Sequence, residues 1–129
     1  LTAESGNEYI LTNQSGTVVT LPKVTAGDKI IFYVGTLVQH PNHHFIHVPA
    51  NGDIMNGWAF IEEIARQPHP VTRYWPATST PFAHTGIRLD GGATGGLIGD
   101  QIELVGISAS EWRVRAFLKG TGTITNPFS

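Results

Sequence analysis

Glycine and proline divide this chain into short segments, and this spacing limits the folds that are open to it. The 129 residues include 15 Gly and 8 Pro, and β-branched and aromatic residues dominate segments such as EYILT (8–12), TVVTL (17–21) and KIIFYVGTL (29–37). Short runs of this kind, bounded by turn residues, are typical of β-strands. In EWRVRAFL (111–118), alternate residues from Trp112 to Leu118 are apolar, as in a strand with one solvated face.

This pattern predicts an all-β fold of about seven or eight short strands. We expect a small single-domain β-sandwich or barrel, jelly-roll-like or β-tulip-like, with at most one short helix. The length suits one domain with its own core. We assign residues 9–129 to this domain and residues 1–8 to a candidate extended N-terminal arm. The turn residues between segments 8–12 and 17–21 predict that these two strands form a hairpin.

Residues 56–85 are the least regular part of the sequence. In NGWAFIEEIARQPHP (56–70), large apolar residues recur every three positions before Pro68. This spacing fits one or two helical turns, but an irregular loop with a short strand fits about equally well. RYWPATSTPFAH (73–84) has two prolines among small polar residues, which predicts an extended surface loop.

Four of the six histidines lie in HPNHHFIHV (40–48). On a helix, His40, His43, His44 and His47 would share one face and could chelate a metal. The neighbouring prolines favour a strand instead, on which His43 and His47 lie about 13 Å apart. Two ligands of one zinc ion bring their nitrogens within about 4 Å of each other. We therefore expect no metal site within one chain and no cofactor.

The expected strand divides its side chains between two faces. His44, Ile46 and Val48 form one face, and His43, Phe45 and His47 form the other. In a homotrimer, a single histidine near the threefold axis would occur three times and could hold an ion there.

The carboxylates and serines do not form a recognisable active site. Glu62 and Glu63 are adjacent, so their side chains point apart on a helix or a strand. Asp53 and Asp100 each follow a turn glycine, where aspartate most often accepts hydrogen bonds from backbone amides. No Gly-x-Ser-x-Gly motif is present, and GGATGG (91–96) lacks the residues of a phosphate-binding loop. We expect a protein that is not an enzyme, without catalytic residues.

Composition argues against several kinds of partner. Charged residues make up 14% of the chain, against roughly a quarter in typical soluble domains, so we expect part of the surface to be buried in an assembly. The net charge of −2 argues against direct binding of nucleic acid. There is no cysteine, which excludes disulfides and thiolate metal sites. The apolar runs are far shorter than the ~20 residues that span a bilayer, so we expect no membrane segment.

Aromatic residues gather in the irregular middle of the chain. Trp58, Tyr74 and Trp75 lie there with Arg66 and Arg73 nearby. Exposed aromatic residues beside arginine could stack on sugar rings or anchor a protein partner. Alternatively, they fill the open end of a small barrel or a subunit interface. With Phe128 of the C-terminal tail, these three are our candidate partner and interface residues.

Three segments have motifs in a recognisable order. GNEYILTNQSGTVVTLPKVTAGDKIIFYVGT (6–36) has a threonine-rich stretch that leads through TLP and AGD into a long apolar strand. NGDIMNG (51–57) supplies a turn, and GDQIELVGISASEWRVRAFLKGTGTITNPFS (99–129) ends in a W-x-V strand, GTGT and a Pro-Phe tail. Together they resemble the capsid decoration (cement) proteins of tailed phages. The histidine stretch and residues 58–85 depart from that pattern.

The resemblance implies a structural virion protein and suggests its partners. It would be made in the host cytoplasm, form a homotrimer, bind the major capsid protein on the outer capsid surface and stabilise the capsid lattice. An alternative is a carbohydrate- or receptor-binding module of a phage fibre or tail, which would bind a host-surface glycan through Trp58, Tyr74 and Trp75. A third hypothesis is a cupin-like metalloenzyme that uses the histidines.

Overall fold

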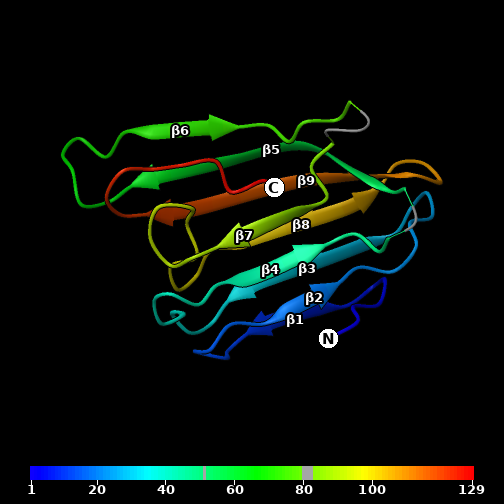
Figure 1. The fold of residues 1–129 in the computed structure, drawn as a ribbon, viewed down its shortest axis with the longest axis horizontal. Coiled ribbons are helices and arrows are strands. Elements are labelled where there is room, and N and C mark those ends of the chain that lie inside the picture. The colour runs from blue at the N-terminus through cyan, green and yellow to red at the C-terminus, as the bar shows by residue number, and fades with distance from the viewer. Residues whose placement is uncertain (51, 80–82) are drawn as a thin grey trace.

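The computed structural model of this chain describes residues 1–50, 52–79 and 83–129. It has an all-β architecture, as the sequence predicts (Figure 1). The described residues form no helix and these strands: β1 (Glu8–Leu11), β2 (Val18–Thr20), β3 (Lys29–Val34), β4 (His44–His47), β5 (Ile54–Glu63), β6 (Val71–Tyr74), β7 (Gly86–Leu89), β8 (Gln101–Gly106) and β9 (Glu111–Gly120). Within the described residues, therefore, no helix could cross a membrane.

The strands form two sheets that pack face to face as a sandwich. The larger sheet has the order β1-β3-β8-β9-β5-β6, and the smaller has the order β2-β4-β7. In Figure 1 the smaller sheet lies in front of β1, β3 and β8. Both sheets mix parallel and antiparallel pairs, and neither closes into a barrel. The sandwich alternative of the predicted fold is therefore the observed one.

The predicted hairpin of the first two strands is wrong. β1 pairs in parallel with β3, whereas β2 pairs in parallel with β4 in the other sheet. Leu11 of β1 and Val19 of β2 are buried in the common core. A tight turn fixes only where the chain reverses, and here the strands gain more by placing these side chains in the sandwich interior from opposite sheets.

The helical alternative for residues 56–70 is also wrong, because β5 is a strand of ten residues. Its buried residues alternate strictly, from Met55 through Gly57 and Ala59 to Ile61 and Glu63. The three-residue spacing of large apolar residues in this segment spans both faces of the strand. β5 pairs in parallel with β9 along its whole length, and the long-range partner decides its conformation.

The core lies between the two sheets and is centred on large apolar side chains. Trp112 and Phe32 are the largest fully buried residues. On β9, Trp112, Val114, Ala116 and Leu118 are buried while Arg113, Arg115 and Phe117 are exposed, as the alternation in the sequence predicts. This arrangement fixes which side chains of β9 point away from the core.

The two ends of the chain cover the two edges of the smaller sheet. Thr2 forms a bridge to Thr20 of β2, and Ala3 is 1% exposed. At the other edge, Phe128 bridges to Ile87 of β7. Such coverage protects sheet edges from pairing with other chains. In this structure the start of the chain therefore lies against the domain, and the extension of residues 1–8 onto a partner stays a prediction.

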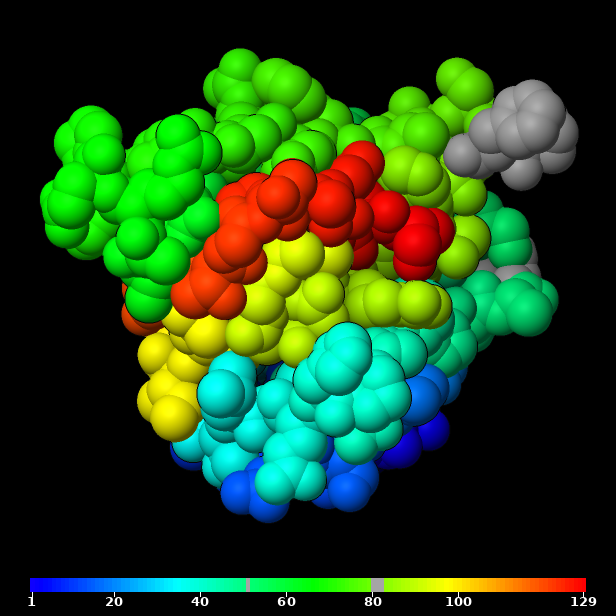
Figure 2. Space-filling model, turned by 60° about the vertical axis from the view of Figure 1, so that its left-hand side comes forward, coloured from blue at the N-terminus to red at the C-terminus, as the bar shows by residue number. Residues whose placement is uncertain are grey.

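The C-terminal segment crosses the surface before it reaches β7. Figure 2 shows it in orange and red, between the green segment that contains β6 and the yellow loop before β8. The amide of Thr125 donates to the carbonyl of Ala93 (2.9 Å), and the Tyr74 hydroxyl donates to the carbonyl of Ile124 (3.1 Å). These contacts hold the tail against both neighbours.

The expected surface loop at 73–84 is shorter than predicted at its start. Arg73 and Tyr74 belong to β6, and residues 75–79 and 83–84 lie outside the strands. Residues 80–82 of this loop, and Asn51 of the expected turn before β5, lie outside the described residues.

Candidate functional site

The outer face of the six-stranded sheet is the surface that the smaller sheet leaves uncovered. Inward-pointing residues of β3, β5, β8 and β9 are buried, whereas every outward-pointing residue of these strands remains at least partly accessible. Large apolar side chains are well exposed here: Ile10 (66%), Val71 (57%), Trp75 (55%) and Phe117 (52%). Apolar side chains gathered on one face of a soluble protein often mark an interaction surface.

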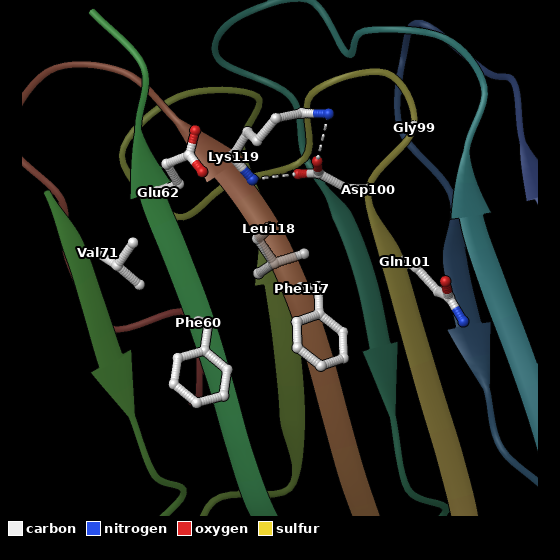
Figure 3. A pocket seen from close by; sticks show the side chains of 9 residues that line it. All are labelled: Phe60, Glu62, Val71, Gly99, Asp100, Gln101, Phe117, Leu118 and Lys119. Carbon is white, nitrogen blue, oxygen red and sulfur yellow. Dashed lines mark hydrogen bonds and ion pairs between the residues drawn. The ribbon is translucent and has the colours of Figure 1, made fainter. Parts of the chain in front are cut away.

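Aromatic and arginine side chains from β5, β9 and the β6 region meet on this face. We call them the aromatic–arginine cluster: Trp58, Phe60, Arg73, Trp75, Arg113, Arg115 and Phe117. The sheet register places Phe60 beside both Phe117 and Arg73. The rings of Phe60 and Phe117 stack with centroids 5.9 Å apart, as neighbours on β5 and β9 (Figure 3).

The arginines of the cluster stack on its indole rings. The guanidinium carbon of Arg73 lies 4.2 Å from the ring centroid of Trp75. Those of Arg113 and Arg115 lie 4.9 Å and 5.7 Å from the Trp58 ring. Cation–π contacts of this kind contribute about 0.5–1 kcal/mol each at exposed sites and restrain long side chains.

The cluster borders two of the hollows on the outer face. The larger, of about 570 Å³, is lined by Phe60, Val71, Phe117 and the polar residues around Lys119 (Figure 3). The smaller, of about 290 Å³, is lined by Asn56, Gly57, Trp58, Trp75, Ile107 and Arg113. The face thus has an apolar hollow near one end and an arginine-lined hollow between two indole rings.

Two of the four candidate interface residues come together on this face, and two do not. Trp58 and Trp75 line the same hollow. Tyr74 points to the opposite side of β6, where it packs against the core and donates its hydroxyl to Ile124. Phe128 is 4% exposed and packs in the core of its own chain, so the tail does not present it to a partner.

Sequence reasoning placed Arg73 near the indole rings but missed four members of the cluster: Phe60, Arg113, Arg115 and Phe117. The alternation of EWRVRAFL did place Arg113, Arg115 and Phe117 on one solvated face of a strand. Phe117 was the one signal, because it is the large aromatic residue on a strand face that is otherwise charged. Only the pairing of β9 with β5 brings this face beside Trp58.

Asp100, on the rim of the larger hollow, organises the backbone around it. Its Oδ2 accepts hydrogen bonds from the amides of Gly96 (2.9 Å), Leu97 (3.0 Å) and Lys119 (2.9 Å). Burial raises the pKa of the Asp100 carboxyl, and these amides and the Lys119 ammonium partly offset the increase. The predicted role of this residue as an acceptor for backbone amides is confirmed.

The other carboxylates also serve local structure. Asp53 is 2% exposed, forms an ion pair with Lys23 and accepts from the amide of Val24 (3.1 Å). Glu62 lines the larger hollow, whereas the adjacent Glu63 is buried and accepts from the amide of Ala65. The two glutamates therefore point apart, as adjacent strand residues must.

The histidine stretch forms a strand with the two faces that the sequence predicts. His44, Ile46 and Val48 are buried, and His43, Phe45 and His47 are partly exposed. Phe45 and His47 stack with ring centroids 5.1 Å apart. Within the described residues, no group of three or more His, Asp or Glu side chains is placed to hold a metal ion.

His44 gives the fold a dependence on pH. Its Nδ1 accepts a hydrogen bond from the amide of Thr17 (3.1 Å), and the side chain is fully buried. Burial lowers the pKa of His44 below the ordinary value of 6.5. The folded protein therefore holds His44 neutral to a lower pH than the unfolded chain does.

We expect the free energy of unfolding to decrease as the pH falls below about 6.5. Below this pH His44 binds a proton in the unfolded chain but not in the folded protein. The stability present at neutral pH is therefore lost as the pH falls from about 6.5 to the lower pKa of folded His44. Urea unfolding at several pH values measures the slope. His44→Gln should flatten it, while His40→Gln, at an exposed position, should not. An unchanged slope in His44→Gln would contradict the assignment.

Comparisons with protein-family models, with curated proteins and with solved structures find no match to this chain.

Proposed function

We propose that this chain is a structural binding protein, a homotrimeric capsid decoration protein that docks on the outside of a tailed-phage head. There it binds the major capsid protein and stabilises the capsid lattice. The observation that carries the proposal is the outer face of the six-stranded sheet, with its exposed apolar residues and aromatic–arginine cluster. The sequence resemblance to capsid decoration proteins supplies the identity of the partner.

The dimensions of the outer face suit a protein partner. Six strands at about 4.8 Å spacing, each roughly 13–33 Å long, give a face on the order of 500–800 Å². A stable protein–protein interface buries about 800 Å² on each partner. Its apolar and aromatic residues are of the kinds enriched in the buried centre of such interfaces, and arginine is enriched there too.

The low charge content supports the same proposal. Only 14% of the residues are charged, so a large share of the surface can be desolvated at low cost. A decoration protein needs two interfaces of this kind, one with its own copies and one with the capsid. We assign the outer face to the capsid contact.

A second candidate function, glycan binding, is favoured by one observation. Trp58 and Trp75 line a common hollow with Arg113, and indole rings stack well on sugars. Tyr74 does not contribute, because it packs against the core on the opposite side of β6. Binding to a glycan array that is lost in Trp75→Ala would support this candidate.

Phe117→Asp should weaken binding to expanded heads that lack the decoration protein by roughly tenfold or more. The substitution removes an exposed anchor at the centre of the face and adds a charge that must be desolvated there. Co-sedimentation of the purified chain with such heads gives the apparent Kd, and mass photometry reports whether the trimer forms.

Val18→Asp is the matched control for this test. Val18 is 57% exposed, close to the 52% of Phe117, but it lies on β2 of the other sheet. It should bind as the wild type does. Equal binding by both variants would argue that the capsid contact lies elsewhere, and no binding by the wild-type chain would refute the proposed function itself.

A further inference from the structure

Two arginines of the outer face lack an anionic partner. No hydrogen bond or ion pair of Arg73 or Arg113 occurs among the described residues, whereas Arg115 lies 3.7 Å from Glu103. Arg73 instead stacks on Trp75 and Arg113 on Trp58. An arginine normally neutralises its charge with a carboxylate when one is within reach, so both remain available to a group from outside the chain.

Stacking prepares these guanidinium groups for such a partner. A guanidinium that stacks on an aromatic ring keeps its N–H groups free at its edges, and the guanidinium carbons of Arg73 and Arg113 lie 4.2 Å and 4.9 Å from their indole rings. The ring also restrains a side chain that would otherwise lose about 2 kcal/mol of rotamer freedom on binding. The two arginines are therefore donors held in place before a ligand arrives.

The neighbouring polar groups also favour an acceptor from outside. Nε1 of Trp58 is shielded from solvent and has no hydrogen-bond acceptor. Asn56 does not supply one, because its Oδ1 accepts from the amide of Gly57 and its Nδ2 donates to Glu111. Because Nε1 of Trp58 is shielded, the arginines are the donors that a ligand in this hollow can reach, and the carboxylate of Glu111 is engaged with Asn56.

We infer that the corner formed by Trp58, Trp75 and Arg113, with Arg73 against the Trp75 ring at its edge, binds a carboxylate side chain of the capsid surface on which the outer face docks. This inference rests on the proposed function. The planar fork of a guanidinium matches the two oxygens of a carboxylate. A hollow of about 290 Å³ has room for one such side chain.

Continuity with the rest of the face favours a protein over a sugar. A saccharide in this hollow would leave Phe117, Val71 and Ile10 exposed elsewhere on the same sheet. A protein surface that inserts an Asp or Glu into the corner covers those apolar residues in the same contact. The carboxylate then fixes the position and orientation of the two proteins across an otherwise flat interface.

The corner is tested first on heads whose carboxylates have been converted to amides with a carbodiimide and ethanolamine. Amidation should weaken binding of the wild-type chain at least tenfold, and Arg73→Ala/Arg113→Ala should weaken binding to untreated heads by a similar factor. Binding of this double variant should no longer depend on amidation. Lysine at both positions should restore only part of the affinity, because an ammonium cannot form the paired contact.

Arg88→Ala is the matched control variant. Arg88 also stacks on an aromatic ring, 5.3 Å from Phe45, but it lies on β7 of the smaller sheet. Its loss should leave binding unchanged. If amidation has no effect, or if Arg88→Ala weakens binding as much as the double variant does, the inference is overturned.

A measurement on the isolated protein separates this inference from the proposed function. Glutarate, added at constant ionic strength, should shift the NMR signals of the Arg113 Nε–H and the Trp58 indole N–H in a saturable way, and Arg113→Ala should abolish the indole shift. If glutarate and chloride give the same NMR shifts, the inference that the corner binds a carboxylate is wrong, while capsid docking could still hold. Conversely, heads that fail to bind the wild-type chain refute the docking and the capsid as the source of the carboxylate, while a saturable glutarate shift would still show that the corner recognises a carboxylate. Tight binding of a uronic acid oligosaccharide, lost in Arg113→Ala, would reassign the corner to a glycan.

Discussion

Replacing Asp100 with alanine should lower the free energy of unfolding by about 3–5 kcal/mol. A single oxygen of Asp100 accepts hydrogen bonds from three backbone amides, those of Gly96, Leu97 and Lys119. Alanine leaves all three donors without an acceptor where the backbone is partly or fully buried, and each unsatisfied donor costs about 1–3 kcal/mol. Urea unfolding followed by tryptophan fluorescence measures the loss.

Asp100→Asn separates the hydrogen bonds from the charge. The amide oxygen of asparagine can occupy the position of Oδ2 and keep all three bonds, while the ion pair with Lys119 (3.6 Å) is lost. Since Lys119 is 41% exposed in this pair, we expect a cost of only about 1 kcal/mol. If asparagine destabilises the protein as much as alanine does, the charge and not the set of amide bonds is the stabilising element.

Gly57→Ala should be comparably damaging, with a loss of about 4 kcal/mol or more or a failure to fold. A Cβ at this position would lie 2.0 Å from the carbonyl oxygen of Val114, and both atoms belong to paired strands that cannot easily separate. Gly57 also has a φ of +114°, a backbone conformation that residues other than glycine rarely adopt. The substitution would push β5 away from β9 at the centre of the larger sheet.

Gly27→Ala isolates the contribution of backbone conformation. Gly27 has a similar φ of +93°, but a Cβ there would meet no atom within 4 Å. Its cost should be limited to the left-handed conformation, about 1–2 kcal/mol. Thermal unfolding of both variants gives the difference that is due to contact with β9, and equal losses would show that this contact is relieved by small shifts.

The Gly57 variant also bears on the candidate site. Trp58 follows Gly57 directly, and the register of β5 against β9 places its ring near Arg113 and Arg115. A folded Gly57→Ala protein with a displaced β5 should therefore lose the stacking on Trp58, which its near-ultraviolet circular dichroism would report.

The sequence alone determined which side chains of a strand share a face, because these alternate with a period of two residues. Alternation along EWRVRAFL assigned Trp112 to the core and Arg113 to the surface, and alternation along HHFIHV placed His44, Ile46 and Val48 on one face, which the structure shows to be the buried one. The all-β class followed from the turn residues that separate such segments. The position of an aspartate after a turn glycine similarly identified Asp100 as an acceptor for nearby amides. All of these are local properties, because side-chain direction in a strand and backbone conformation at a turn depend on adjacent residues.

Only the tertiary structure decided which strands pair. Because strand pairing brings the residues of the candidate site together, the tertiary structure decided the site as well. β1 and β2 are close in sequence but belong to different sheets, while β5 pairs with β9 across about fifty residues. Strand pairing depends on the total apolar surface that the sandwich buries, to which every segment contributes, and no single turn controls it. For this reason the sequence identified Trp58 and Trp75 as candidates but also selected Tyr74, which packs against the core, and Phe128, which is buried in it. It gave no means of joining Phe117 and Arg113 to Trp58, because that proximity exists only across two paired strands.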